Sequence, residues 1–315
     1  MTRAARTAPP TFALLALLAV FPRSHAQTPG PPLPVTEVAP GVYVHQGAHE
    51  EIAATNRGDI ANIGFIVGTR CVAVIDTGGS VETGAALRRA IRAVTPLPVC
   101  YVINTHVHPD HILGNAAFRD DRPAYIAHHK FRRAIATRAE HYLNSVSRAL
   151  DTSMTTADMV LPTRFLAEDS TLDLGDRTLV LRIHPTAHTD NDLTVFDTRT
   201  RTLWLSDLLF IDRVPALDGS IRGWLAELER LRATAAERVV PGHGPPSAPW
   251  PDALAPLERY LGAIMKETRQ VIAANGTLEE AVAQVGQDER NGWILFDDYH
   301  RRNVTAAFAE LEWED

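Results

Sequence analysis

The feature that most constrains this chain is a cluster of imidazoles and a carboxylate directly after an apolar run. The run Val99–Ile103 has the character of a buried strand, and Thr-His-Val-His-Pro-Asp-His follows it. A chain that turns sharply after a strand can direct His106 and His108 to one side and Asp110 and His111 to the other. Zinc and similar divalent ions prefer imidazole and carboxylate ligands. We therefore predict a metal site here, the alternative being a polar loop that happens to contain histidines.

This His-x-His-x-Asp-His motif resembles the metal-binding signature of the metallo-β-lactamase superfamily. The resemblance implies further ligands in a set order, each at the end of a strand. His188 lies between two predicted strands, where the family has its third imidazole. Asp207 ends a strand and matches the family's bridging aspartate, and His243 stands in a Pro-Gly-His-Gly turn that matches the last ligand. Each is weak evidence alone, but together and in this order they are strong.

The resemblance implies a binuclear site with three protein ligands for each metal and one shared carboxylate. The expected ligands are His106, His108 and His188 for the first metal, Asp110, His111 and His243 for the second, and Asp207 as the bridge. We expect two Zn²⁺ ions, with iron or manganese as alternatives. Paired divalent ions lower the pKa of the water between them, so we predict a bridging hydroxide nucleophile that the catalytic residue Asp110 holds in line. The commonest zinc β-lactamases have a cysteine in the region of Asp207, and its absence disfavours β-lactam hydrolysis as the native activity.

Apolar runs and helical spacing predict an α+β fold. Val72–Ile75, a helix with its apolar positions at i, i+3, i+4 and i+7, and Val99–Ile103 form a parallel βαβ unit. Short strands separated by turns follow over 164–209 and indicate a second, mostly antiparallel sheet. We predict a four-layer αββα sandwich over 39–250, with a C-terminal helical extension over 251–315 packed on it. Further helices are expected over 130–150, 221–231, 257–271 and 291–314, together with a short helix that a capping box of Thr277 and Glu280 begins.

The first residues have the features of a secretory signal. Arg3 and Arg6 precede an apolar run, and Ser24-His25-Ala26 offers small residues at the cleavage positions. We predict a signal peptide over 1–26, an uncleaved membrane anchor being the alternative, and a flexible lead-in over 27–38. Export implies an oxidising compartment, the periplasm. The formal charge of −7 and the lack of a basic patch with aromatics make nucleic acid a poor partner. No membrane association is expected after signal cleavage.

The chain has two cysteines, Cys71 and Cys100, each five residues before the end of a predicted strand. If these strands are parallel neighbours, the two sulfur atoms lie at one level and a disulfide is possible. Because a bridge across adjacent strands is strained, we interpret both as small buried side chains.

Other polar residues have predicted places around the site. Asp76 is expected either to orient a ligating histidine or to cap a helix, and Asp192 is expected to act as an outer-sphere acid. We interpret His184 as structural and His49 as a solvated loop residue, with substrate contact as the alternative for His49. The remaining predictions are surface positions for His128, His129 and His141, and positions near the substrate for Tyr299, His300 and Asn303, with a packed C-terminal helix as the alternative.

Three further stretches are similar to exported metallohydrolases associated with quinoprotein dehydrogenase systems, relatives of a sulfur-oxidation-cluster metallohydrolase. The stretches are 40–43, 57–65 and 291–311. The resulting hypothesis is an exported binuclear zinc hydrolase whose substrate is a small-molecule ester, thioester or cyclic amide. One alternative is an iron-dependent persulfide dioxygenase of the same fold, which leaves the second site empty. Another is a non-catalytic periplasmic metal-binding partner of a quinoprotein system.

Overall fold

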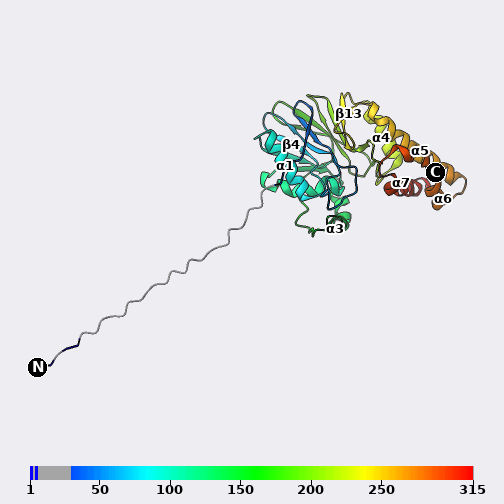
Figure 1. Ribbon diagram of the computed structural model, residues 1–315. Helices are drawn as coiled ribbons and strands as arrows, with labels where there is room; N and C mark the ends of the chain where they lie inside the picture. The colour runs from blue at the N-terminus through cyan, green and yellow to red at the C-terminus, as the bar shows by residue number, and fades with distance from the viewer. Residues whose placement is uncertain (3, 6–29, 315) are drawn as a thin grey trace. The chain divides into compact units, whose positions relative to one another are not determined.

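The computed structural model describes residues 1, 2, 4, 5 and 30–314. The predicted signal peptide and the start of the lead-in therefore lie almost wholly outside the described residues. The compact unit that begins at Pro31 contains two β-sheets with helices around them (Figure 1). No helix among the described residues has the length and apolar character needed to cross a membrane.

The first sheet runs in chain order from β1 to β7, and the second has the order β13-β12-β11-β10-β9-β8. The strands of the first sheet are β1 (Thr36–Ala39), β2 (Val42–His45), β3 (Ile63–Val67), β4 (Val72–Ile75), β5 (Val99–Ile103), β6 (Ala124–His128) and β7 (Arg164–Leu166). Those of the second are β8 (Ser170–Asp173), β9 (Thr178–Ile183), β10 (Leu193–Asp197), β11 (Thr202–Phe210), β12 (Arg238–His243) and β13 (Ala248–Pro249).

Strands β4 to β7 pair in parallel, because helices connect most of them, whereas the second sheet is antiparallel apart from the pair β11–β12. The helices are α1 (Val81–Val94), α2 (Pro109–Ile112), α3 (Phe131–Ala149), α4 (Ile221–Arg232), α5 (Ala255–Ala273), α6 (Leu278–Gln284) and α7 (Phe296–Leu311). Short 3₁₀ segments cover Leu113–Asp121, Asp252–Leu254 and Gln287–Gly292. The capping box at Thr277 and Glu280 is present.

Strand β4 shows how the sequence builds the layers. All four of its residues are buried, and successive side chains point to opposite faces. Val72 and Val74 pack outward with Leu87 and other residues of α1, while Ala73 and Ile75 join the apolar cluster between the two sheets. The layers are therefore helix, sheet, sheet and helix, and the predicted αββα sandwich with C-terminal helices is confirmed.

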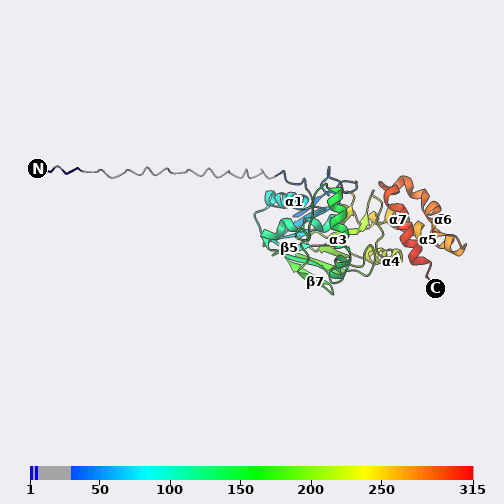
Figure 2. The same ribbon diagram turned by 90° about the horizontal axis from the view of Figure 1, so that it is seen from below.

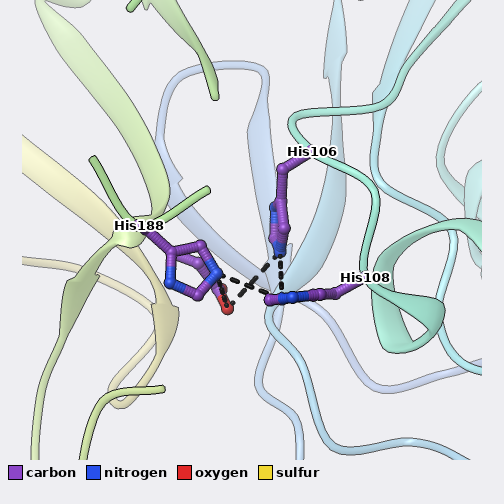
Figure 3. A group of neighbouring side chains, drawn as sticks. His106, His108 and His188 are labelled. Atoms are coloured by element: carbon purple, nitrogen blue, oxygen red, sulfur yellow. Dashed lines mark hydrogen bonds and ion pairs between the residues drawn. The ribbon is translucent and has the colours of Figure 1, made fainter. Parts of the chain in front are cut away.

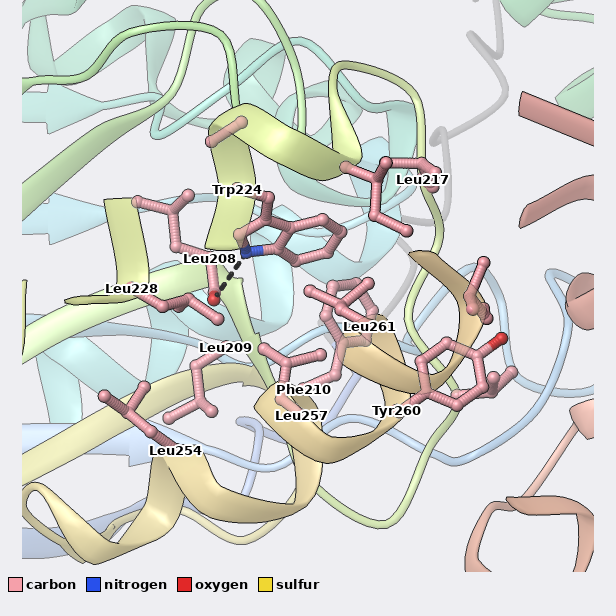
Figure 4. Packing of buried hydrophobic residues seen from close by; sticks show 14 of the residues in the cluster. Leu208, Leu209, Phe210, Leu217, Trp224, Leu228, Leu254, Leu257, Tyr260 and Leu261 are labelled. Atoms are coloured by element: carbon pink, nitrogen blue, oxygen red, sulfur yellow. Dashed lines mark hydrogen bonds between the residues drawn. The ribbon is translucent and has the colours of Figure 1, made fainter. Parts of the chain in front are cut away.

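Helices α4 and α5 cover the outer face of the second sheet, and α7 packs on α5. All three lie at the end of the domain away from α1 (Figure 2). Leu208 and Phe210 of β11 pack against Trp224 of α4 and Leu257 of α5 (Figure 4). The indole Nε1–H of Trp224 donates to the backbone oxygen of Leu208 over 3.1 Å, so this buried polar atom is satisfied. This packing fixes the strand that carries Asp207.

Two predicted boundaries differ from the structure. Strand β1 begins at Thr36, inside the range given to the flexible lead-in, because it pairs with β2 at the edge of the first sheet. Strand β7 pairs with β6 and belongs to the first sheet, although it lies in the 164–209 range assigned to the second. Neither strand is long enough to give a clear alternating pattern.

The interpretation of Cys71 and Cys100 as separate buried side chains is wrong, because they form a disulfide with Cα atoms 5.8 Å apart. The reason is a bulge between β4 and β5. Val72 pairs with Val99 and Ala73 with Tyr101, so Cys100 is an extra residue in β5. A bulge redirects the side chain of its extra residue, which lets Cys100 reach across to Cys71.

Candidate metal centre

Most of the candidate ligands lie next to the ends of strands from both sheets. His106, His108, Asp110 and His111 follow β5 through the turn into α2, and the rings of His106, His108 and His188 point toward one another (Figure 3). The prediction that Asp207 ends a strand is wrong, because β11 continues through it to Phe210, whereas His243 is the last residue of β12. The structure therefore brings together all seven side chains that the sequence singled out, from positions up to 137 residues apart in the chain.

The first group consists of His106, His108, His188 and Asp207. Nδ1 of His108 lies 3.1 Å from Nε2 of His106 and 3.1 Å from Nε2 of His188. The Asp207 Oδ2 atom lies 3.6 Å from Nε2 of His106 and 3.4 Å from Nε2 of His188. Four ligand atoms around a tetrahedral zinc ion lie about 3.3 Å from one another. The spacing of the first group fits such an ion.

The second group consists of Asp110, His111 and His243, and Asp207 adjoins it. The Asp110 Oδ2 atom lies 3.6 Å from Nε2 of His111 and 3.4 Å from Nε2 of His243. Oδ1 of Asp207 lies 3.1 Å from Nε2 of His111, so its carboxylate contacts both groups. Within residues 30–314, His111 Nε2 and Asp207 Oδ1 are buried atoms with no hydrogen-bond partner. A cation between them would satisfy both.

In all five histidines, the nitrogen that does not face the group has an oxygen next to it. Nδ1 of His111 lies 2.9 Å from Asp76 Oδ2, and Nδ1 of His106 lies 3.1 Å from Thr105 Oγ1. The other three partners are the backbone oxygens of Ala216 for His188 and Ile60 for His243, and the carboxylate of Asp218 for His108. A proton held on this nitrogen leaves the lone pair of the other nitrogen free, as metal binding requires.

Local backbone conformation aims these side chains. Asp76 and Ser206 have φ angles of 54° and 49°, in the left-handed region that few residues other than glycine adopt. This conformation lets Asp76 accept from the backbone N–H of Thr105 as well as from His111. Gly242 is required for space, because a Cβ atom at that position would lie 1.8 Å from Asp207 Oδ1. The glycine before His243 therefore allows β12 to pass next to the shared carboxylate.

The pKa shifts favour the metal-binding forms of both carboxylates and of two imidazoles, whereas His111 is the exception. Burial lowers the pKa of His106 well below its ordinary value and that of His188 to about 3, so both imidazoles are neutral at neutral pH. Burial acts to raise the pKa of Asp110 and that of Asp207, but the adjacent His111 and His243 outweigh it and lower both. Burial acts to lower the pKa of His111, but Asp207, Asp110 and Asp76 outweigh it and raise the pKa well above its ordinary value, so this imidazole gives up a proton when a metal binds.

A cleft of about 660 Å³ opens over the two groups. Its walls come from three places: the loop with Glu51 and Ile52, helix α3 with Tyr142 and Val146, and helix α7 with Tyr299. Asp110, Asp207 and His243 line its floor. The cleft is therefore apolar toward α3, whereas Arg213 and Arg302 make it cationic toward α7.

Predictions for the residues around the site have mixed outcomes. Asp76 orients His111, and the cap of α1 is Ser80 instead. His184 is structural, since it lies 2.8 Å from both Glu227 Oε1 and Thr194 Oγ1. Asp192 accepts from the backbone N–H and the hydroxyl of Thr189, one residue after His188.

Three predictions are corrected. His300 faces away from the cleft and is buried between Tyr260 and the Val285 oxygen, because its face of α7 packs on α5. Tyr299 and Asn303 do line the cleft. His128 is buried at the end of β6 rather than on the surface, because α3 covers that strand end. His49 is not solvated at its ring nitrogens, which are buried atoms without a hydrogen-bond partner among residues 30–314.

Sequence reasoning missed Asp218, Arg213 and Ser206. Asp218 and Arg213 stand in an irregular segment after β11, where neither periodicity nor a motif marks them. The hydroxyl of Ser206 lies between Asp76 and Thr105. Its place next to Asp207 was the only available signal.

Comparison with known proteins agrees with this geometry. The family model described as the metallo-beta-lactamase superfamily matches residues 56–243. The chain belongs to the metallo-beta-lactamase superfamily, and its fold and site are those of metal-dependent hydrolases. No curated protein matches the sequence.

Solved structures resemble the chain at low identity. A metallo-beta-lactamase from Pontibacter korlensis has a TM-score of 0.59 and 20% identity, over 73% of this chain and 99% of that chain. The metallo-beta-lactamase FIM-1 from Pseudomonas aeruginosa, in a mono-zinc form, has a TM-score of 0.58 and 18% identity, over 75% and 98%. The sec-alkylsulfatase Pisa1 from Pseudomonas sp. has a TM-score of 0.67 and 16% identity, over 89% of this chain and 50% of that chain. A match over 89% necessarily includes part of the C-terminal helices.

Proposed function

We propose that this chain is an exported, binuclear zinc-dependent hydrolase of an ester, a thioester or a cyclic amide. The observation that carries the proposal is the convergence of seven side chains into two adjacent groups that share Asp207 on the floor of a cleft. Superfamily membership supports the reaction class. The signal-like N-terminal sequence and the disulfide between Cys71 and Cys100 support export to the oxidising periplasm.

The first metal would be held by His106, His108 and His188, and the second by Asp110, His111 and His243, with Asp207 between them. When bound, a pair of divalent cations supplies a water of lowered pKa and a Lewis acid for a scissile carbonyl. Asp110 lines the cleft and is ionised, so its carboxylate can accept a proton and orient a water at the cleft floor. Asp207 is 3% exposed and lies between the groups, which suits it to a structural bridge.

The cationic end of the cleft supports an anionic group on the substrate. The guanidinium of Arg213 is buried, donates to the Tyr299 hydroxyl over 3.0 Å and lies 3.6 Å from Glu51. The guanidinium carbon of Arg302 lies 5.6 Å from the centre of the Tyr299 ring. We expect Arg302→Met to raise KM about tenfold for anionic substrates and to change kcat little, because Arg302 lines the cleft, whereas Arg213 also lies 3.0 Å from Nδ1 of the candidate ligand His243.

The decisive experiment measures metal content and hydrolysis on the purified mature protein. Two equivalents of zinc and turnover of one member of a panel of thioesters, lactones, β-lactams and sulfate esters are expected. Sulfate esters belong to the panel because the structurally similar Pisa1 is described as an alkylsulfatase. Asp110→Asn should lower kcat by about 10²–10⁴-fold, whereas Glu168→Gln, an exposed acid, serves as the matched control.

Two other functions make different predictions in the same experiment. A persulfide dioxygenase would hold one iron and consume oxygen, and the complete second group of ligands favours two metals over that alternative. A non-catalytic metal-binding partner of a quinoprotein system would bind metal but turn over nothing in the panel. The cleft over both groups favours an enzyme. Full activity of Asp110→Asn would contradict the proposed role of that carboxylate.

A further inference from the structure

The five candidate histidine ligands differ in what holds their second ring nitrogen. The partners of His106, His111, His188 and His243 are buried side chains or backbone oxygens. The partner of His108 is the carboxylate of Asp218, at 3.2 Å, and the Asp218 side chain is 40% exposed on the wall of the cleft. His108 is thus the one candidate ligand among these five whose orientation depends on an accessible charge.

The backbone of Asp218 is fixed from both sides. Its N–H donates to the backbone oxygen of His188 over 3.1 Å. Asp218 therefore contacts two candidate ligands of the first group, His108 through its side chain and His188 through its backbone. One residue earlier, the N–H of Leu217 donates to the side-chain oxygen of Asn303 on α7. The amide nitrogen of Asn303 donates in turn to the backbone oxygen of Pro215 over 2.7 Å. The freedom that Asp218 retains is therefore mainly in its side chain.

Helix α3 restrains that side chain. Arg138 donates to Asp218 Oδ2 over 3.3 Å, to the same oxygen that faces His108. Tyr142 and Val146 lie one and two turns further along the helix, and both line the cleft. The face of α3 that meets the cleft therefore also carries the arginine that holds Asp218.

We propose that Asp218 is a positioning residue for His108, and that Arg138 couples the position of α3 to metal affinity at the first group. This inference rests on the proposed function only in that it requires a metal to bind there. A charged acceptor on the second nitrogen of a ligating histidine fixes its tautomer and raises its basicity. Asp218 lines the cleft, and Arg138 borders it. Contacts between a substrate and α3 therefore act on the hydrogen bond between Arg138 and Asp218. Substrate binding and metal binding at the first group then change each other's affinity by the same factor.

The test is zinc competition with a chromophoric chelator, which reports the affinity of each of the two sites without any substrate. Asp218→Asn should weaken one site about 10–100-fold and leave the other within about twofold, and Asp218→Glu should restore part of the loss. Arg138→Met should weaken the same site about two- to fivefold, because the pair is partly exposed. Arg133→Met removes an exposed arginine from the same helix and should change neither site.

The double variant Asp218→Asn with Arg138→Met separates coupling from general damage to the helix. If Arg138 acts through Asp218, the double variant binds zinc no more weakly than Asp218→Asn alone. Additive losses, an unchanged affinity in Asp218→Asn, or equal weakening of both sites would overturn the inference while leaving the hydrolase proposal intact. A wild-type protein that binds no zinc would overturn both.

Discussion

Two sets of buried histidines in this protein look alike by burial but differ in their hydrogen bonds. His106, His111, His188 and His243 are nearly inaccessible, and so are His45, His184 and His300 elsewhere in the domain. In the second set both ring nitrogens have oxygen partners within 3.0 Å, such as Pro34 and Asp59 around His45. In the first set one nitrogen has an oxygen partner within 3.1 Å, and the other faces further candidate ligands. Burial therefore does not distinguish these two sets, whereas a ring nitrogen that faces other candidate ligands does.

The largest difference in metal content and activity should appear when one histidine of each set is replaced by glutamine. We expect His188→Gln to lose the first metal and to lower hydrolysis by more than about 100-fold, since even outer-sphere partners are worth 10–100-fold. His184→Gln should keep both metals and activity but lose about 1–3 kcal/mol of the free energy of unfolding, because Glu227 and Thr194 lose a buried partner.

Metal analysis, turnover and denaturant unfolding measure these outcomes on the same preparations. If His184→Gln loses metal, or His188→Gln keeps it, the distinction between the two sets fails.

A smaller effect is expected from the buried acceptor of the second group. Asp76→Asn should weaken zinc affinity about 10–100-fold at the second site, because an amide cannot hold the Nδ1 proton of His111 as a carboxylate does. Stepwise chelator competition measures it. Asp59→Asn, which changes the acceptor of a histidine outside the centre, is the matched variant and should leave both zinc affinities unchanged.

Removal of metal should affect stability as well as activity. Zinc at 100 times its dissociation constant stabilises the folded state by about 2.7 kcal/mol per site. Treatment with a chelator should therefore lower Tm, and added zinc should restore it. Added zinc should raise the Tm of chelator-treated His188→Gln less than that of the chelator-treated wild type. An equal rise in Tm would mean that the zinc binds elsewhere.

The smallest effect concerns His128, a buried histidine remote from the candidate ligands. Burial lowers its pKa to about 4, below the ordinary value of 6.5. At a pH between these two pKa values, the folded state therefore binds fewer protons than the unfolded state. The stability contributed by the neutral His128 side chain is lost as pH falls from about 6.5 through 4. His128→Gln should reduce this acid sensitivity by at most about 2 kcal/mol. Unfolding free energies measured at pH 4.5 and 7 for both proteins test it, and identical pH dependence would contradict the assignment.

Local sequence was enough to predict much of the fold. A continuous apolar run gave the strand Val72–Ile75, because both of its faces are buried, and helical spacing gave α5, because its apolar side chains share one buried face. It failed at Cys100, where a bulge shifts the register by one residue, and at His300, where the packing of α5 decides which face of α7 is buried. Both outcomes depend on a second element that lies elsewhere in the chain.

By itself, the sequence determined the types and the order of the candidate ligands. Four of them lie within six residues, and the resemblance to the metallo-β-lactamase signature pointed to His188, Asp207 and His243 by their order along the chain. Only the tertiary structure decided which nitrogen of each imidazole faces the centre, and that Asp218 and Arg213 approach it from an irregular segment. The physical reason is that ligand identity is a property of single residues, whereas the orientation of a ring depends on acceptors supplied by other strands and helices.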